Sequence, residues 1–250
     1  KTNPGIQRLA ITFDDGLKNN FTHAAPVLRR LGIPATFFIC TPAEGQEAKL
    51  WPDELNILTS HLEHDINLGG STFHRHAWNV WKTKEGLSIE DFFRPKTSAE
   101  RRVFLDELTA LHPADFWQGI DPLYYQLMSE DEMTTLSRHP LFDLGCHAQD
   151  HSLLGLMDKN EAVSQLANNK NKLERLTGTP IGSVAYPDGN YSRELIDDAE
   201  NLGLDLQMAV NFRFPEDEMD GRLWSRFGFH QDRSWIEQLH RLNLRFHEKQ

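Results

Sequence analysis

The amino-acid sequence predicts an α/β fold in which helices cover a parallel sheet or barrel. Two observations support this prediction. Along most of the chain, short apolar runs rich in β-branched and aromatic residues alternate with amphipathic segments of helical period. The first two runs and the helical segment between them span about 32 residues, the size of a crossover that joins parallel strands.

The first strand–helix–strand unit lies near the start of the chain. The first predicted strand, Leu9-Ala-Ile-Thr-Phe13, runs directly into Asp14-Asp15-Gly16. The next segment repeats apolar residues at helical spacing and ends at Gly32, because glycine commonly terminates helices. Its apolar residues are Phe21, Ala25, Leu28 and Leu31. The second predicted strand is Ala35-Thr-Phe-Phe-Ile-Cys40.

The alternation resumes at residue 128. Ser129 and Glu132 have the spacing of a capping box, in which each side chain bonds the other residue's backbone N–H, so a helix is predicted to start there. An amphipathic pattern from Trp235 to Phe246 predicts a final helix. Between them, strands are predicted over 143–146, 183–186, 204–210 and 223–229, and helices near 158–176 and 192–202.

Residues 42–127 lack this rhythm and are predicted to form an insertion. The segment is too long for a plain loop, and Thr97-Ser-Ala-Glu100 is a second capping box, so the insertion is expected to be partly helical. Four of the six tryptophans lie here, either as the insertion's own core or as surfaces that stack on sugar rings. The predicted organisation is therefore a catalytic part, 1–41 and 128–250, with a cap subdomain, 42–127.

The composition narrows the class of function. The chain has 250 residues, 26 Lys and Arg, 37 Asp and Glu, and a formal net charge of −11. An acidic chain without a long Lys/Arg run predicts no nucleic-acid partner, and no apolar stretch reaches the roughly 18 residues of a membrane span. Cys40 and Cys146 each end an apolar run and are expected to be buried thiols. With no signal-peptide pattern at the start, and assuming that none was removed, we expect a cytoplasmic protein.

The first candidate site is the pair of carboxylates in Asp14-Asp15-Gly16, at the end of a predicted buried strand. Gly16 permits a turn that brings both carboxylates to one pocket. Two adjacent carboxylates raise one another's pKa unless a cation neutralises them, so a divalent metal on one leaves the other as a base. Taken alone, the same tripeptide is also typical of an ordinary turn.

The second candidate site is His147-Ala-Gln-Asp-His151, which follows another predicted strand. Histidines four residues apart share a face of a helical turn, an arrangement suited to zinc and similar divalent metals. Asp150 is a candidate to orient one imidazole ring. The alternative is two surface histidines on a loop, but two such motifs at strand ends of one chain favour a metal site.

The third candidate is Val184-Ala-Tyr-Pro-Asp-Gly189, where a predicted strand runs into a turn. Pro187 restricts the backbone and Gly189 relaxes it, so backbone N–H groups can face a pocket. A plain β-turn predicts the same residues equally well.

In this order, Thr-Phe-Asp-Asp-Gly, Ala-Thr-Phe-Phe, Gly-x-His-x-x-x-His and Tyr-Pro-x-Gly resemble the polysaccharide deacetylases (carbohydrate esterase family 4, the NodB-homology domain). The resemblance covers about 9–41 and 128–230, and the aromatic-Ala-Tyr-Pro pattern is closest to a subgroup of that family. It implies a distorted (β/α) barrel with the partly helical insertion, and a hydrolase that removes acetyl groups from sugars.

The resemblance also implies residue roles. Asp14 resembles the family's catalytic base. Asp15, His147 and His151 resemble the ligands of one divalent metal ion, for which zinc is the first expectation and cobalt, nickel or manganese are alternatives. The backbone N–H of Asp188 resembles the donor to the oxyanion. Metal and base fit the chemistry, since a metal polarises an acyl carbonyl and acidifies water while a carboxylate accepts the proton.

Two positions depart from the family pattern. Many members have Arg two residues before the motif proline, and this chain has Ala185, so Arg226 or Arg222 is expected to support the base. The family's Leu-x-His acid motif is also not evident, and His230 is the nearest candidate for the acid.

The expected substrate is an N-acetylated sugar or glycan precursor in surface polysaccharide or lipopolysaccharide biosynthesis. Two other functions stay open: a deformylase or cyclic-amide hydrolase with the same site, and a carbohydrate-binding module with impaired catalysis.

Overall fold

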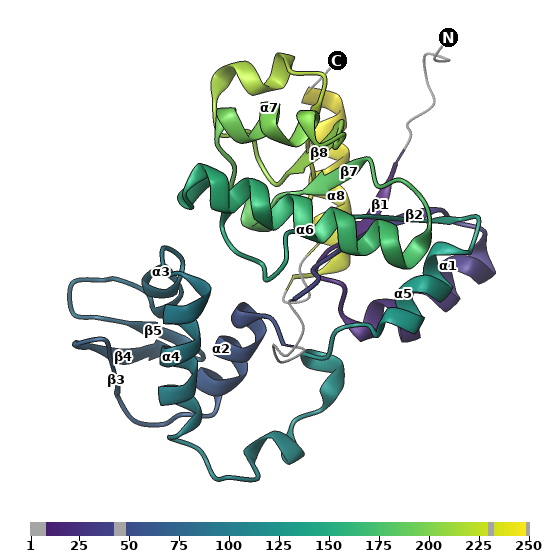
Figure 1. Ribbon diagram of the computed structural model, residues 1–250. Coiled ribbons are helices and arrows are strands. Elements are labelled where there is room, and N and C mark those ends of the chain that lie inside the picture. Colours follow the sequence, from purple (N-terminus) through teal and green to yellow (C-terminus); the bar gives the residue numbers. More distant parts are fainter. Residues whose placement is uncertain (1–8, 43–48, 230–232, 249–250) are drawn as a thin grey trace.

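The computed structural model describes residues 9–42, 49–229 and 233–248, and it contains a six-stranded parallel sheet (Figure 1). The strand order is β1-β2-β6-β7-β8-β9, and every neighbouring pair is parallel. The strands are β1 (Ile11–Phe13), β2 (Ala35–Ile39), β6 (Phe142–Cys146), β7 (Ser183–Ala185), β8 (Leu206–Ala209) and β9 (Leu223–Ser225). The predicted α/β class is confirmed. Five of the six strands are shorter than predicted, and β6 is one residue longer.

Helices connect these strands where the amphipathic patterns predicted them. A π-helical turn (Asn20–Ala24) and α1 (Ala25–Leu31) join β1 to β2, and the helix ends at Gly32 with φ +67°. The other helices of this part are α5 (Glu130–Ser137), α6 (Lys159–Thr177), α7 (Arg193–Asn201) and α8 (Trp235–Glu248). Short helical turns lie at Leu154–Leu156, Pro187–Gly189 and Pro215–Met219. The capping box predicted at Ser129 and Glu132 is present.

The main hydrophobic core lies between the sheet and its helices. From α6 it contains Ala162, Leu166 and Leu173, all buried, which pack in one cluster with Leu144 and Cys146 of β6. The burial of these side chains accounts for the position of α6 across the sheet in Figure 1. Neither Cys146 nor Cys40 forms a disulfide, and both are buried, as predicted.

The sheet is a curled partial barrel. Its edges are β1 and β9, and within the described part of the chain no backbone ladder joins them. Arg226, which directly follows β9, nevertheless donates to Thr12 Oγ1 of β1 at 3.0 Å. The two edges therefore approach closely enough for one side chain to bridge them.

Between β2 and β6 the chain forms a separate lobe, drawn in blue to teal at the lower left of Figure 1. The lobe contains α2 (Trp51–Ser60), α3 (Ile89–Phe93), α4 (Ser98–Thr109) and helical turns at Phe116–Gly119 and Pro122–Tyr124. The capping box predicted at Thr97 and Glu100 is present. An antiparallel sheet of β3 (Ile66–Leu68), β4 (Ser71–Ala77) and β5 (Val80–Lys82) was not predicted.

The lobe has its own hydrophobic cluster, which includes the buried Trp51 and Trp81. Trp78, in contrast, is 79% exposed, so the tryptophans of this region divide between core and surface. The chain returns beside the first motif, where Met128 N–H donates to the Gly16 carbonyl at 2.9 Å. The exact boundaries of a cap subdomain at 42–127 stay a prediction.

Candidate metal and catalytic site

The carboxyl ends of the parallel strands meet at one edge of the sheet, and the candidate residues lie there. Asp14 and Asp15 follow β1, His147 follows β6, Asp188 lies just after β7, and Arg226 follows β9. This edge is where open parallel sheets and barrels form their sites, because side chains from several strand ends converge there.

A tight turn brings both carboxylates of the first motif to this edge. Asp15 and Gly16 have φ values of +73° and +80°, and Gly16 N–H donates to the Asp14 carbonyl at 2.9 Å. A Cβ at Gly16 would lie 2.7 Å from Cγ2 of Ile39, so both the backbone angle and the space require glycine. Cys40 N–H donates to the Asp15 carbonyl at 3.1 Å and holds the turn against β2.

The two histidines converge on Asp15, but not through the predicted helical turn. The segment is a loop in which Ala148 and His151 have left-handed φ values of +60° and +58°. Nε2 of His147 and Nε2 of His151 lie 3.3 and 3.4 Å from the same atom, Asp15 Oδ1. The segment therefore does not form the helical turn, and the structure places the side chains of Asp15, His147 and His151 together.

A hydrogen bond determines which ring nitrogen of His147 is available to bind a metal. Nδ1 lies 2.7 Å from the Ala185 carbonyl oxygen, which can only accept, so Nδ1 carries the proton and donates. In the neutral ring Nε2 then has a free lone pair that faces Asp15. The backbone N–H of His147 donates to Asn169 Oδ1 at 3.0 Å, which positions the residue from α6.

These residues fit a divalent metal. Asp15 Oδ1 and His151 Nδ1 are buried and have no hydrogen-bond partner among the described residues, which is unusual for buried polar atoms. Tetrahedral zinc with bonds of about 2.0–2.1 Å separates its ligand atoms by about 3.3 Å. The two distances from Asp15 Oδ1 are close to that separation, so Asp15 is spaced from each imidazole as two ligands of one ion would be.

Cys40 offers a second possible donor set. One donor atom each of Asp15, Cys40 and His147 lie within 4.8 Å of one another. The Cys40 thiol, however, donates to the His147 carbonyl oxygen at 3.0 Å. Burial and the neighbouring Asp15 charge raise its pKa well above the usual range, which disfavours the thiolate that a metal requires. We therefore favour His151 as the third ligand.

The electrostatics of the cluster follow from burial and close charges. Burial alone would raise the pKa of Asp15, but the close imidazoles of His147 and His151, with a smaller effect of Arg226, lower it to about 2. Burial lowers the pKa of His151 and favours its neutral form. In His147 the effect of burial is outweighed by the carboxylates of Asp14 and Asp15, which raise its pKa.

Arg226 holds the second carboxylate. Its Nη1 and Nη2 donate to Oδ1 and Oδ2 of Asp14 at 2.7 and 2.6 Å. Arg222, the other candidate, pairs instead with Asp197, Asp220 and Glu200 on the outside of the protein. Of the two arginines expected to support the base, Arg226 is therefore the one that contacts Asp14.

Asp188 lies in the turn after β7 with a left-handed φ of +52°. Its carboxylate pairs with Arg94 of the insertion, with Nη2 3.2 Å from Oδ2. Asp150, expected to orient a histidine ring, instead accepts from the Ser98 hydroxyl and from the Ser152 N–H at 3.2 Å. His230 lies outside the described residues.

One titratable residue beside the site was not predicted from the sequence. Asp53 lies in the first turn of α2. Burial, with a smaller effect of the Asp15 charge, raises its pKa from 3.8 to about 7. The only sequence signal was a carboxylate within the apolar stretch Leu50-Trp-Pro-Asp-Glu-Leu55, and charged residues at such positions are usually paired or functional.

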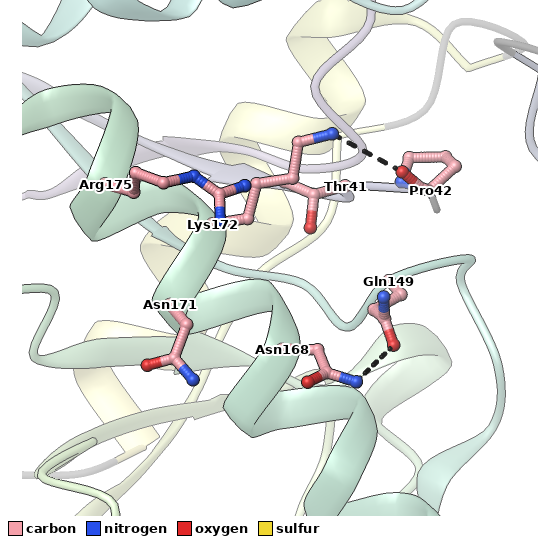
Figure 2. Close-up of a pocket in the computed structure, with 7 residues that line it drawn as sticks. All are labelled: Thr41, Pro42, Gln149, Asn168, Asn171, Lys172 and Arg175. Atoms are coloured by element: carbon pink, nitrogen blue, oxygen red, sulfur yellow. Dashed lines mark hydrogen bonds between the residues drawn. The ribbon is translucent and has the colours of Figure 1, made fainter. Parts of the chain in front are cut away.

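A cavity of about 490 Å³ lies on the α6 side of the histidine loop (Figure 2). Its lining is polar, and α6 supplies most of it. In Figure 2, Asn168 donates to Gln149 at 3.2 Å and Lys172 to the Pro42 carbonyl at 3.5 Å. The lining residues are Thr41, Pro42, Gln149, Asn168, Asn171, Lys172 and Arg175. No candidate catalytic or metal-binding residue is among them.

Comparisons with known proteins agree with the motifs. A deacetylase from Streptococcus pyogenes, PplD in complex with acetate, has a TM-score of 0.53 at 14% identity, over 95% of this chain and 71% of that one. A de-N-acetylase from Aggregatibacter actinomycetemcomitans has a TM-score of 0.51 at 12% identity, over 93% and 73%. At these identities the likeness shows the fold alone.

No curated protein sequence matches the chain. None of the described helices is long and apolar enough to cross a membrane. The sequence profile of the polysaccharide deacetylases matches residues 1–207, which include both metal motifs and the Tyr-Pro-Asp-Gly turn. The chain belongs to the polysaccharide deacetylase family.

Proposed function

We propose that this protein is a metal-dependent hydrolase that removes the acetyl group from an N-acetylated sugar. One observation carries the proposal. Asp15 Oδ1 is a buried atom without a hydrogen-bond partner in the described chain, and two imidazole nitrogens face it at 3.3 and 3.4 Å. Beside it, a second carboxylate is held by an arginine at the same edge of the sheet.

In the proposed site, Asp15, His147 and His151 hold one divalent metal. Two imidazoles and a carboxylate suit zinc, with cobalt, nickel or manganese as alternatives. When bound, such a metal supplies Lewis acidity toward an acyl oxygen and toward water. The Nδ1–H bond of His147 to the Ala185 carbonyl orients one ligand, as second-shell contacts commonly do.

The protein's own groups have three proposed tasks. Asp14, oriented through both oxygens by Arg226, accepts the proton of the attacking water. The backbone N–H of Asp188 donates to the oxygen of the tetrahedral intermediate. A protonated group then donates to the leaving nitrogen. His230 is the proposed acid, and Asp53 is a second candidate because its raised pKa of about 7 keeps it partly protonated near neutrality.

The proposed substrate is an N-acetylated sugar or glycan precursor in surface polysaccharide or lipopolysaccharide biosynthesis. Support comes from the family and from the lobe of 42–127. Arg94 of this lobe pairs with Asp188 of the Tyr-Pro-Asp-Gly turn. A lobe in contact with the site favours a short or chain-end substrate over a long polymer in an open groove. The Tyr-Pro-x-Gly subgroup and a cytoplasmic location stay predictions.

The test combines metal analysis with acyl release. The purified protein is expected to retain about one equivalent of divalent metal and to release acetate from a panel of N-acetylated sugars. Asp14→Asn is expected to lower kcat by about 10²- to 10⁴-fold while metal content is unchanged. Release of formate from the corresponding N-formyl sugars, with no acetate from the N-acetylated panel, would indicate a deformylase. Metal binding without turnover of any panel member would favour a binding module.

A further inference from the structure

The backbone of His151 is held in a strained conformation by the insertion lobe. Its φ of +58° is unfavourable for a residue other than glycine, and such conformations persist only where surrounding contacts enforce them. The backbone carbonyl of His151 accepts a hydrogen bond of 3.0 Å from Nε1 of Trp51. Both residues are only 8% exposed, so water does not readily replace this contact.

Trp51 is in turn held by Arg101 of α4. The guanidinium carbon of Arg101 lies 4.7 Å from the centre of the Trp51 ring, and Arg101 is 3% exposed. Its Nη1 donates to the Ser152 hydroxyl, next to His151, at 3.0 Å. Its other donors bond the carbonyls of Phe93 and Arg94 at 3.2 Å each. A third contact joins the lobe to the same loop, from Ser98 to Asp150.

These contacts connect the lobe to the metal-binding loop. A change in the position of Trp51 or Arg101 moves the His151 carbonyl or the Ser152 side chain, and with it the imidazole that faces Asp15. We infer that Trp51 and Arg101 are positioning residues for the His151 ligand, so that the insertion is part of the metal site as well as a cover over it. This inference rests on the proposed role of His151 as a ligand.

Trp51→Phe tests the inference, and Trp81→Phe is a matched control. Both tryptophans are buried in the same hydrophobic cluster of the lobe. The Trp81 indole N–H has no acceptor in the described chain, whereas that of Trp51 bonds the ligand's carbonyl. Both variants lose a similar volume and one N–H, but only Trp51→Phe loses a contact to the metal loop.

The measurement is the zinc dissociation constant of each variant, by competition with a chromophoric chelator, together with the melting temperature of the metal-free protein. Trp51→Phe is expected to raise the dissociation constant by about tenfold, in the range of lost outer-shell contacts, and Trp81→Phe by less than about twofold. The melting temperature is expected to fall further in Trp51→Phe, because a buried carbonyl is left without its donor, so the zinc dissociation constant is the deciding measurement. Equal zinc affinities would overturn the inference, whereas a wild-type protein that binds no zinc would overturn the proposed function itself.

A second pair of variants serves if Trp51→Phe does not fold. Arg101→Lys keeps the charge but loses the forked contacts to Ser152 and to the carbonyls. Arg102→Lys changes the next residue of α4, which pairs with Glu54 and Asp106. Arg101→Lys is expected to raise the zinc dissociation constant at least fivefold relative to Arg102→Lys, and equal constants would overturn the inference.

Discussion

Arg226 and Asp14 form a two-pronged ion pair across the two edges of the sheet, with N···O distances of 2.7 and 2.6 Å. Asp14 follows the first strand and Arg226 the last, 212 residues later. The same arginine donates to Thr12. A forked guanidinium restrains a carboxylate in position and rotation at once, which is what a general base requires. One side chain therefore both contacts the opposite edge of the sheet and orients the proposed base.

Arg226→Lys is expected to lower kcat by roughly 10- to 100-fold, because a lysine makes a single contact and leaves Asp14 free to rotate. Metal content is expected to stay unchanged. Arg222→Lys is the control, since Arg222 pairs only with exposed or partly exposed carboxylates away from the site and is expected to stay within about twofold of wild type. Steady-state acetate release gives both values. Equal rates in the two variants would show that Asp14 does not depend on Arg226.

The identity of the third metal ligand is tested by His151→Ala and Cys40→Ser. If His151 binds the metal, its loss is expected to raise the zinc dissociation constant by at least about 100-fold, more than the loss of an outer-shell group. Cys40→Ser keeps a donor to the His147 carbonyl and is expected to change the constant by less than about threefold. The opposite result would assign the metal to the set Asp15, Cys40 and His147.

The proposed role of Asp188 belongs to its backbone N–H. Substitutions of its side chain are therefore expected to change activity by changing the backbone conformation. Glycine adopts the observed φ of +52° without strain, whereas a β-branched residue there costs about 1–2 kcal/mol or more. Asp188→Gly is expected to retain kcat within about threefold, although it loses the pair with Arg94. Asp188→Val is expected to lose about 10²-fold, near the effect of removing an oxyanion donor. A large loss in Asp188→Gly would instead assign the role to the carboxylate.

The strand-end motifs could be predicted from sequence because each is local. A buried run followed by Asp-Asp-Gly, or by two histidines, is visible within ten residues, and parallel strands bring such ends together. From the sequence, Arg226 and Arg222 were both candidates to support Asp14. The choice between them depends on how far the sheet curls, which no local pattern shows. The helical turn expected at 147–151 fails for a related reason. Ala148 and His151 have left-handed backbones, and the His151 carbonyl accepts from Trp51, a contact that no local pattern records.

The insertion was the least predictable part of the chain. Its strands are three to seven residues long, and β4 carries His-Arg-His where an alternating apolar pattern would be expected. Nothing in the sequence distinguishes Trp51 from the other tryptophans of the insertion or Arg101 from the neighbouring Arg102. Their contacts to His151 and Ser152 span 100 and 51 residues of sequence and became visible only in the fold.

Asp53 predicts a pH-dependent stability of the metal-free protein. Its pKa is about 7 in the folded state against 3.8 for an ordinary aspartate. A raised pKa means that folding favours the protonated form, so the stabilisation is complete below about pH 4 and is lost as the pH rises to about 7. The slope due to this group reaches about 1.4 kcal/mol per pH unit. Asp53→Asn removes the ionisation and is expected to be more stable than wild type at pH 8.

The measurement is the free energy of unfolding in urea at pH 5 and pH 8, with metal removed. The advantage of Asp53→Asn over wild type is expected to be roughly 1–3 kcal/mol larger at pH 8 than at pH 5. Asp115→Asn, an exposed carboxylate of the same lobe, is the control and is expected to show no such difference. If the two variants behave alike, Asp53 ionises as it would in water. Asp53 would then not stay protonated near neutrality, and it would no longer be a candidate for the acid.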